Sequence, residues 1–295
     1  MHESRRARYA SPEGLGQAFN FDLLQSDFDA GSFKKIITDN LVAAKESGAS
    51  STWVFSNHDV VRHATRYGLP KGGSVAQGTN AAQDITGGKP KGQDGKGWLL
   101  AGAPAEELDV ELGLRRARAA TLLLLALPGS AYLYQGEELG LREVSEIPDS
   151  ERQDPSFFRN PPGVEIGRDG CRVPLPWTAE GASFGFGAGK AHLPQPEWFK
   201  DYAVSRQEGV EGSTLELYRK ALGLRSELQT DEELEWVETG NQDVLHFSRP
   251  GGWHTVTNFG SEPVELPEGD SVVTSGPLED GKLPSDTTAW VVRKA

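Results

Sequence analysis

Residues 51–62, which read STWVFSNHDVVR, constrain the fold of this chain more than any other segment. The apolar residues 53–55 are β-prone and form a run of the length expected for a fully buried strand. Four polar residues, 56–59, follow that run directly. In α/β folds, catalytic and ligand-binding side chains lie at the carboxyl ends of such strands. The alternative interpretation is structural, because Asn and Asp also form Asx turns and helix caps at strand ends.

The residues before this segment predict a strand and then a helix. Residues 17–23 alternate enough to form a strand, and residues 29–47 form an amphipathic helix that Gly48 ends. The apolar residues of the helix recur at helical spacing: Phe33, Ile36, Ile37, Leu41 and Ala44. Because a strand–helix–strand unit places its two strands parallel, we expect a parallel sheet that contains residues 17–23 and 51–56.

The middle of the chain continues this alternation of helices and strands. Residues 69–104 are polar and glycine-rich, which predicts a long loop, either an ordered lid or a disordered segment. A helix is predicted over residues 106–127, ended by a Pro-Gly pair, and a short strand over residues 131–134. Residues 141–212 are rich in Pro and Gly and predict an irregular excursion.

The last part of the chain changes from helical to strand periodicity. Ser213 and Glu216 match the S-x-x-E capping box, which predicts that a final long helix begins there. After about Thr230 the apolar residues alternate in short runs separated by turns. The runs that predict a small antiparallel β-sandwich are 234–238, 243–249, 252–259, 270–275 and 288–293.

Charge and composition exclude several functional classes. The net charge of −13 argues against a nucleic-acid partner, and no apolar run is long enough to cross a membrane. The histidines lack metal-ligand spacing and no phosphate-binding glycine motif is present, so we expect neither a metal nor a cofactor. Cys171 is the only cysteine, and no apolar signal segment occurs near the N-terminus. We therefore expect a cytoplasmic protein without disulfides.

Two further stretches join FSNHDVVR in one pattern, AATLLLLALPGSAYLYQGEELGL at 119–141 and RDGCRVPLPW at 168–177. Together they resemble the C-terminal half of the α-amylase superfamily of glycoside hydrolases (family 13), in particular its α-glucosidase and oligo-1,6-glucosidase branch. Residues 16–22, GQAFNFD, are similar to the sixth barrel strand of that branch. The resemblance implies strands six to eight of a (β/α)₈ barrel in residues 1–228 and an antiparallel β-sandwich domain in residues 229–295.

The resemblance also implies roles for three residues. Most glycoside hydrolases use two carboxylates, which are about 5–5.5 Å apart in retaining enzymes. The family adds the Asp of its NHD triplet, which corresponds to Asp59 and would stabilise the transition state. His58 matches the His that hydrogen-bonds the same sugar ring, while Arg62 would pair with a carboxylate or line the next subsite. The implied function is a retaining α-glucosidase that acts on short α-linked glucosides.

Two family motifs are absent from the sequence, namely G-F-R-x-D with the nucleophile and the segment with the acid/base Glu. We therefore expect an N-terminally truncated enzyme that does not hydrolyse α-glucosides by itself. One alternative is a non-catalytic relative that binds a sugar or a partner protein. Another is a transglycosylating or isomerising member of the family. The oligomeric state is left open.

The remaining charged residues in these motifs are expected to be structural. Glu137 and Glu138 are adjacent, and adjacent positions on a turn point in different directions, so they rarely converge on one substrate atom. Arg168, Asp169 and Arg172 are expected to form ion pairs that fix a loop rather than to act on a sugar.

Overall fold

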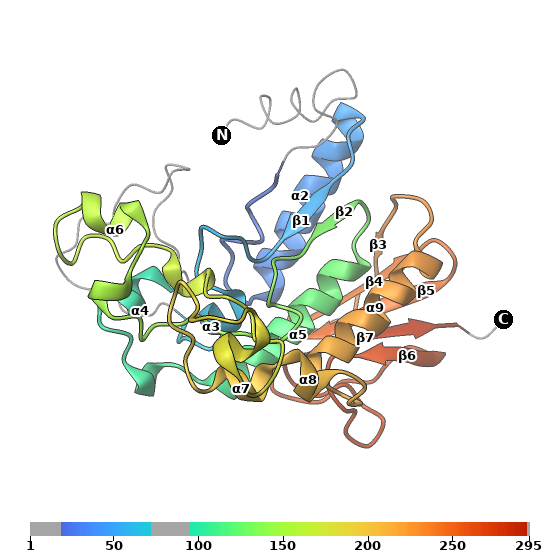
Figure 1. Ribbon diagram of the computed structural model, residues 1–295. Coiled ribbons are helices and arrows are strands. Elements are labelled where there is room, and N and C mark those ends of the chain that lie inside the picture. Colours follow the sequence, from blue (N-terminus) through green and yellow to red (C-terminus); the bar gives the residue numbers. More distant parts are fainter. Residues whose placement is uncertain (1–18, 72–94, 294–295) are drawn as a thin grey trace. The chain divides into compact units, whose positions relative to one another are not determined.

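The computed structural model describes residues 19–71 and 95–293 (Figure 1). The chain forms two compact units. The first takes residues 1–55, 115–133 and 217–295, and the second takes residues 56–114 and 134–216. The division into domains at residues 228 and 229 stays a prediction.

Helix α2, Ala30–Ser47, confirms the first predicted helix. It begins at Asp29, whose carboxylate accepts the backbone N–H of Ser32 at 2.8 Å and so satisfies one of the free N–H groups of the first turn. It ends at Gly48, which has φ 65°, a left-handed conformation that glycine adopts without steric cost. The phenyl ring of Phe33 is fully buried and packs with the rings of Phe28, Phe55 and Phe259, with centroid distances of 5.4–6.0 Å.

Strand β1, Thr52–Val54, and strand β2, Ser130–Tyr132, pair in parallel, as predicted. Thr52 lies opposite Ser130, and Val54 lies opposite Tyr132. The indole of Trp53 is buried, and its Nε1–H donates to the carbonyl of Pro128, so the aromatic ring is packed without leaving its polar atom unsatisfied.

The predicted strand at 17–23 is wrong in its described part, residues 19–23, which form no strand. The Asn20 side-chain oxygen accepts the backbone N–H of Asp22 at 2.9 Å, and this local bond competes with strand pairing. A turn follows, in which the Gln25 N–H donates to the Phe21 carbonyl. The segment still lies beside β1, because the Asn20 N–H donates to Thr52 Oγ1 at 3.1 Å. Residues 17 and 18 lie outside the described part.

Part of the predicted loop at 69–104 is helical. Helix α4, Lys96–Leu100, follows the short helix α3, His63–Arg66, in chain order, and its Trp98 and Leu99 are buried. The prediction of a lid or a disordered segment falls mainly on residues 72–94, which lie outside the described residues. The next helix, α5, Val110–Ala126, begins later than predicted, after the 3₁₀ turn Ala105–Glu107. Asp109 fixes that start, since its carboxylate accepts the Leu112 N–H at 2.9 Å.

The last long helix, α9, Thr214–Leu228, begins where the capping box predicted. The hydroxyl of Ser213 accepts the backbone N–H of Glu216 at 3.2 Å, which is the first half of the motif. The carboxylate of Glu216 reaches the N–H of Gly209 at 2.9 Å, so it also secures the chain before the helix.

The five strands after α9 form one antiparallel sheet in the order β3-β4-β5-β7-β6 (Figure 1). Each of the first four predicted runs contains one strand, and the last run, 288–293, overlaps the fifth, which begins one residue earlier. The strands are β3 Glu235–Trp236, β4 Val244–Arg249, β5 Trp253–Asn258, β6 Asp270–Thr274 and β7 Thr287–Val292. Val244, Val256 and Ala289 from this sheet pack with Leu283, which pairs with Val264 through an isolated bridge. The all-β end of the chain is therefore confirmed.

The excursion at 141–212 is irregular, as predicted, and contains only short helices. They are η2 Asp149–Glu151, α6 Pro155–Arg159, η3 Asp169–Cys171, η4 Ala182–Gly185, α7 Phe199–Tyr202 and α8 Val204–Gln207. Its residues Val144, Val173 and Phe199 pack in one hydrophobic cluster with Leu139, which precedes the excursion. In the described part of the chain, no helix is long and apolar enough to cross a membrane.

Two histidines on neighbouring strands of the β sheet predict a pH-dependent stability. His246 Nε2 lies 2.9 Å from His254 Nδ1, and burial together with the neighbouring His254 and Arg293 lowers the pKa of His246 to about 4. Burial also lowers the pKa of His254. The unfolded chain binds protons near pH 6.5 and the folded chain does not, so stability is lost as the pH falls from 6.5 toward 4.

We expect His246→Gln to remove about 1–2 kcal/mol of this loss, after allowance for solvent screening at a partly exposed ring. Urea unfolding of both proteins at pH 7.5 and pH 4.5 measures the difference. His192→Gln, at an exposed histidine, is the matched control and should behave as wild type. An identical pH dependence in wild type and His246→Gln would contradict the prediction.

Candidate active site

The NHD residues, Asn57 to Asp59, follow β1 in the chain immediately after two buried residues, Phe55 and Ser56. The Asn57 side-chain oxygen accepts the Asp59 N–H at 2.8 Å, which is an Asx turn. Ser56 fixes the next turn, because its hydroxyl lies 2.7 Å from His63 Nδ1 and accepts the His63 N–H at 3.1 Å. The interpretation of these residues as an Asx turn is thus correct for Asn57. The side chains of His58 and Asp59 take no part in that turn and reach solvent.

Asp59 supplies the carboxylate of this loop, and three neighbouring side chains contact it. Its Oδ1 accepts hydrogen bonds from Arg168 Nη1 at 2.6 Å and from Arg172 Nη2 at 3.1 Å. Its Oδ2 lies 3.4 Å from His58 Nε2. The Asp59 side chain is 34% exposed and the His58 side chain is 65% exposed. Two guanidinium groups therefore fix the orientation of a carboxylate that still reaches solvent.

Arg168 is in turn held by Asp154, whose side chain is fully buried. Arg168 Nε donates to Asp154 Oδ2 at 2.6 Å and Nη2 donates to Oδ1 at 3.1 Å, a bidentate pair. These hydrogen bonds hold the pKa of Asp154 well below its usual range. The same carboxylate accepts the Ser156 N–H at the start of α6. Sequence reasoning did not single out Asp154, since nothing in its local pattern distinguishes it from an ordinary helix cap.

The ion pairs expected of Arg168 and Arg172 are confirmed, and they include Asp59. Asp169 differs from the expectation. Its Oδ2 accepts the backbone N–H groups of Gln153 and Asp154 at 3.0 and 3.1 Å, so it orders the loop through the main chain.

Arg62 is buried, with 3% of its surface exposed. Its guanidinium donates to the carbonyls of Gln135 and Cys171, both at 2.9 Å, and lies over the ring of Tyr134 at 5.0 Å. Through these contacts Arg62 links the loop that carries Asp59 to the main chain at Gln135 and Cys171. The sugar contact predicted for Arg62 stays a prediction, and in this structure the guanidinium hydrogen-bonds to main-chain oxygens.

The adjacent carboxylates of the QGEE segment contact the protein itself, as expected. Glu137 is buried, with Oε2 at 3.8 Å from His63 Nδ1. Glu138 Oε2 accepts the N–H of Gly136 at 2.7 Å. Among residues 19–71 and 95–293, no three His, Cys, Asp or Glu side chains gather as a metal site would require.

One buried acid in this unit had no sequence signal. Glu143 is 4% exposed, and its Oε2 accepts the backbone N–H of Arg62 at 3.1 Å. Burial raises the pKa of this carboxyl to about 7, against the opposing effect of Arg62 and Arg66. Glu143 belongs to no motif in the segment LREVSE, so only the folded structure reveals its position.

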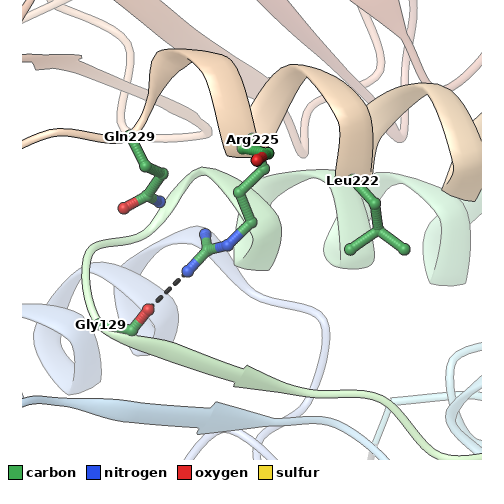
Figure 2. A pocket seen from close by; sticks show the side chains of 5 residues that line it. Gly129, Leu222, Arg225 and Gln229 are labelled. Atoms are coloured by element: carbon green, nitrogen blue, oxygen red, sulfur yellow. Dashed lines mark hydrogen bonds between the residues drawn. The ribbon is translucent and has the colours of Figure 1, made fainter.

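An open pocket of about 370 Å³ lies in the first compact unit and is lined by Gly129, Leu222, Arg225, Ser226 and Gln229. The guanidinium of Arg225 points to the carbonyl of Gly129 (Figure 2) and also donates to the carbonyl of Leu127 at 2.9 Å. These carbonyls follow the C-terminal end of α5, where carbonyl groups lack intrahelical partners. The polar groups of the pocket thus serve the helix end, and none of the predicted site residues lines it.

Comparison with known proteins places these motifs in context. A family model described as the catalytic domain of alpha amylase matches residues 106–232. A probable alpha-glucosidase of Rhizobium meliloti (strain 1021) is 32% identical over 220 residues, which is 74% of this chain and 32% of the relative. A salivary alpha-glucosidase of Aedes aegypti is 28% identical over 177 residues, which is 57% of this chain and 30% of the relative.

Solved structures are similar along the whole chain. An alpha-glucosyl transfer enzyme aligns with a TM-score of 0.69 and 28% identity, covering 100% of this chain and 49% of that one. Trehalose-6-phosphate hydrolase of Bacillus licheniformis aligns with a TM-score of 0.70 and 20% identity, covering 100% of this chain and 55% of that one. The chain therefore spans about a third of these curated relatives and about half of these solved structures.

The Asp154–Arg168 pair predicts a specific loss of stability. Asp154→Asn keeps the size of the side chain but removes the charge that holds Arg168, so we expect the free energy of unfolding to fall by about 1–3 kcal/mol. Urea denaturation at pH 7 measures this. Asp149→Asn is the matched control, because Asp149 also pairs with an arginine but its side chain is 81% exposed. Equal effects of the two variants would contradict the anchoring role of Asp154.

Proposed function

Because the chain belongs to the α-amylase family of glycoside hydrolases, we propose that it contributes the transition-state-stabilising side of an α-glucosidase active site. Its fold is that of the C-terminal part of a (β/α)₈ barrel followed by an antiparallel β domain. In this proposal Asp59 and His58 contact the sugar ring at which the glycosidic bond breaks.

The observation that carries the proposal is the way the Asp59 carboxylate is held. Arg168 and Arg172 both donate to Oδ1, while Oδ2 faces the exposed ring of His58. A carboxylate that is oriented before the substrate arrives needs little reorganisation when positive charge develops on the sugar ring in the oxocarbenium-like transition state. Hydrogen bonds that Asp59 accepts from sugar hydroxyls would then contribute to the rate to the extent that they strengthen in that state.

The proposed substrates are short α-linked glucosides, and the proposed reaction is hydrolysis with retention of configuration. The named alpha-glucosidases among the relatives support this choice. Retention requires a nucleophile and an acid/base on opposite sides of the bond, and the 295 residues contain no G-F-R-x-D segment. We propose that both reacting carboxylates belong to residues outside this sequence. Glucosyl transfer is the related alternative, because one of the structural neighbours is named for it.

The test combines binding and turnover by the purified chain. We expect maltose binding, measured by isothermal titration calorimetry, to weaken roughly tenfold or more in Asp59→Asn, because a charged hydrogen-bond acceptor is lost. Asp149→Asn, which removes an exposed carboxylate, should leave the affinity unchanged. Turnover of 4-nitrophenyl α-glucoside should stay at background, since a general acid or base alone contributes about 10²–10⁴-fold.

Three results would change this interpretation. Equal maltose affinity in wild type and Asp59→Asn would remove Asp59 from the sugar site. Turnover that disappears in Asp59→Asn would place the reacting carboxylates within the 295 residues. If a protein completed with an upstream barrel half binds maltose but does not cleave 4-nitrophenyl α-glucoside, the non-catalytic binding protein becomes the better hypothesis.

A further inference from the structure

Glu143 contacts the start of α3 through both its side chain and its main chain. Its carboxylate accepts the Arg62 N–H at 3.1 Å, and its own N–H donates to Thr65 Oγ1 at 2.7 Å. Arg62 is the residue before α3 and makes no side-chain cap of its own to this helix. Burying a carboxyl group costs free energy unless hydrogen bonds or charges compensate. An apolar side chain would fill the same space without that cost, so the polar contacts of Glu143 indicate a specific role.

The other side of the Glu143 carboxyl is in contact with the turn that contains Arg168 and Arg172. A Cβ atom at Gly170 would lie 2.4 Å from Glu143 Oε1 and 2.5 Å from the Val144 carbonyl. The Val144 N–H also donates to the Gly170 carbonyl at 3.2 Å. Only a glycine therefore lets this turn approach Glu143 so closely.

The loop at 57–62 and the turn at 168–172 are thus joined at several points around one buried acid. The Arg62 guanidinium donates to the Cys171 carbonyl at 2.9 Å, and Arg172 Nε donates to the His58 carbonyl at 2.8 Å. The same turn supplies both guanidinium groups that hold Asp59. A shift of the turn relative to the loop would change the orientation of the Asp59 carboxylate.

We propose that Glu143 is a positioning residue that holds the Asp59 loop, residues 57–62, against the turn at 168–172. The proposal rests on the proposed function only in taking Asp59 as the carboxylate that contacts the sugar. Glu143 itself touches no substrate in this proposal and acts through Arg62 and Gly170.

The charge of Glu143 gives the proposal a distinctive signature. The charged and titratable groups that act on this site are Arg62, which precedes α3, Arg66 of α3, Cys171 of η3, and Tyr134. Because the pKa of Glu143 is about 7, its carboxyl changes charge near neutral pH. The ionised form is the stronger acceptor for the Arg62 N–H, so the contact strengthens as the pH rises through 7 and weakens as it falls.

The first experiment follows the Arg62 amide by NMR in the ¹⁵N-labelled chain between pH 5.5 and 8.5. We expect its proton shift to titrate with a midpoint near 7 in wild type and not to titrate in Glu143→Gln. In Glu143→Ala its hydrogen exchange should accelerate roughly tenfold or more. The Ser205 amide, which donates to the Trp177 carbonyl at 3.0 Å in the same unit, should keep its protection. Glu197→Gln, at an exposed glutamate, is the matched control and should change neither amide.

The second experiment measures maltose affinity in the same variants. Glu143→Ala removes the carboxylate, and Gly170→Ala places a methyl group against it. Both should weaken binding, and Glu143→Gln should bind more tightly than Glu143→Ala at pH 6, where the wild-type carboxyl is largely protonated. Normal Arg62 exchange in Glu143→Ala, equal loss of protection at Ser205, or unchanged affinity after loop release would each overturn the proposal. If wild type does not bind maltose at all, the proposed function fails, and the Arg62 amide still decides whether Glu143 holds the loop.

Discussion

The bidentate contact between Asp154 and Arg168 is the interaction on which the geometry of the candidate site depends. Asp154 is fully buried and belongs to a segment with little regular structure, so ion pairs and main-chain hydrogen bonds define its shape more than helices do. Since two of the guanidinium nitrogens of Arg168 are occupied by Asp154, the third can point in only one direction, toward Asp59. The buried carboxylate of Asp154 therefore determines, through Arg168, how the partly exposed carboxylate of Asp59 is oriented.

The sequence predicted those elements of the fold whose cause is local. Helix α2 has its cap at Asp29, its stop at Gly48 and its apolar face between them, and the β strands show their period directly. The strand expected at 17–23 was wrong because the Asn20 side chain forms a competing turn. Helix α4 was missed because Trp98 and Leu99 become a core only through Val61 and Leu69, which lie far from them in the chain.

The candidate site also has features that the local sequence predicts and features that depend on distant contacts. His58 and Asp59 could be proposed as site residues from the sequence because they form a motif in consecutive residues. The partners of Asp59 could not, since Arg168 and Arg172 reach it from an excursion whose path no periodicity describes. Arg62 is buried, and its guanidinium donates to the carbonyls of Gln135 and Cys171. The sequence could not predict this, because both partners lie far from Arg62 in the chain. A short-range pattern thus supplies candidate residues, whereas long-range contacts decide how their side chains are oriented.

The end of α5 has a consequence for how this protein can be divided. Donors from later segments bind the carbonyls at this end: Arg249 of β4 donates to Ala126, the last residue of α5, and Arg225 donates to Leu127, which follows it. Farther back, Trp290 of β7 donates to the carbonyl of Leu122 at 3.0 Å. Some hydrogen-bond donors to the carbonyls of α5 are therefore residues that the ribosome adds long after the helix itself. A chain cut before β4 would remove the Arg249 donor from the buried carbonyl of Ala126 and the Trp290 contact to Leu122, so the β sheet stabilises α5 and is more than a detachable module.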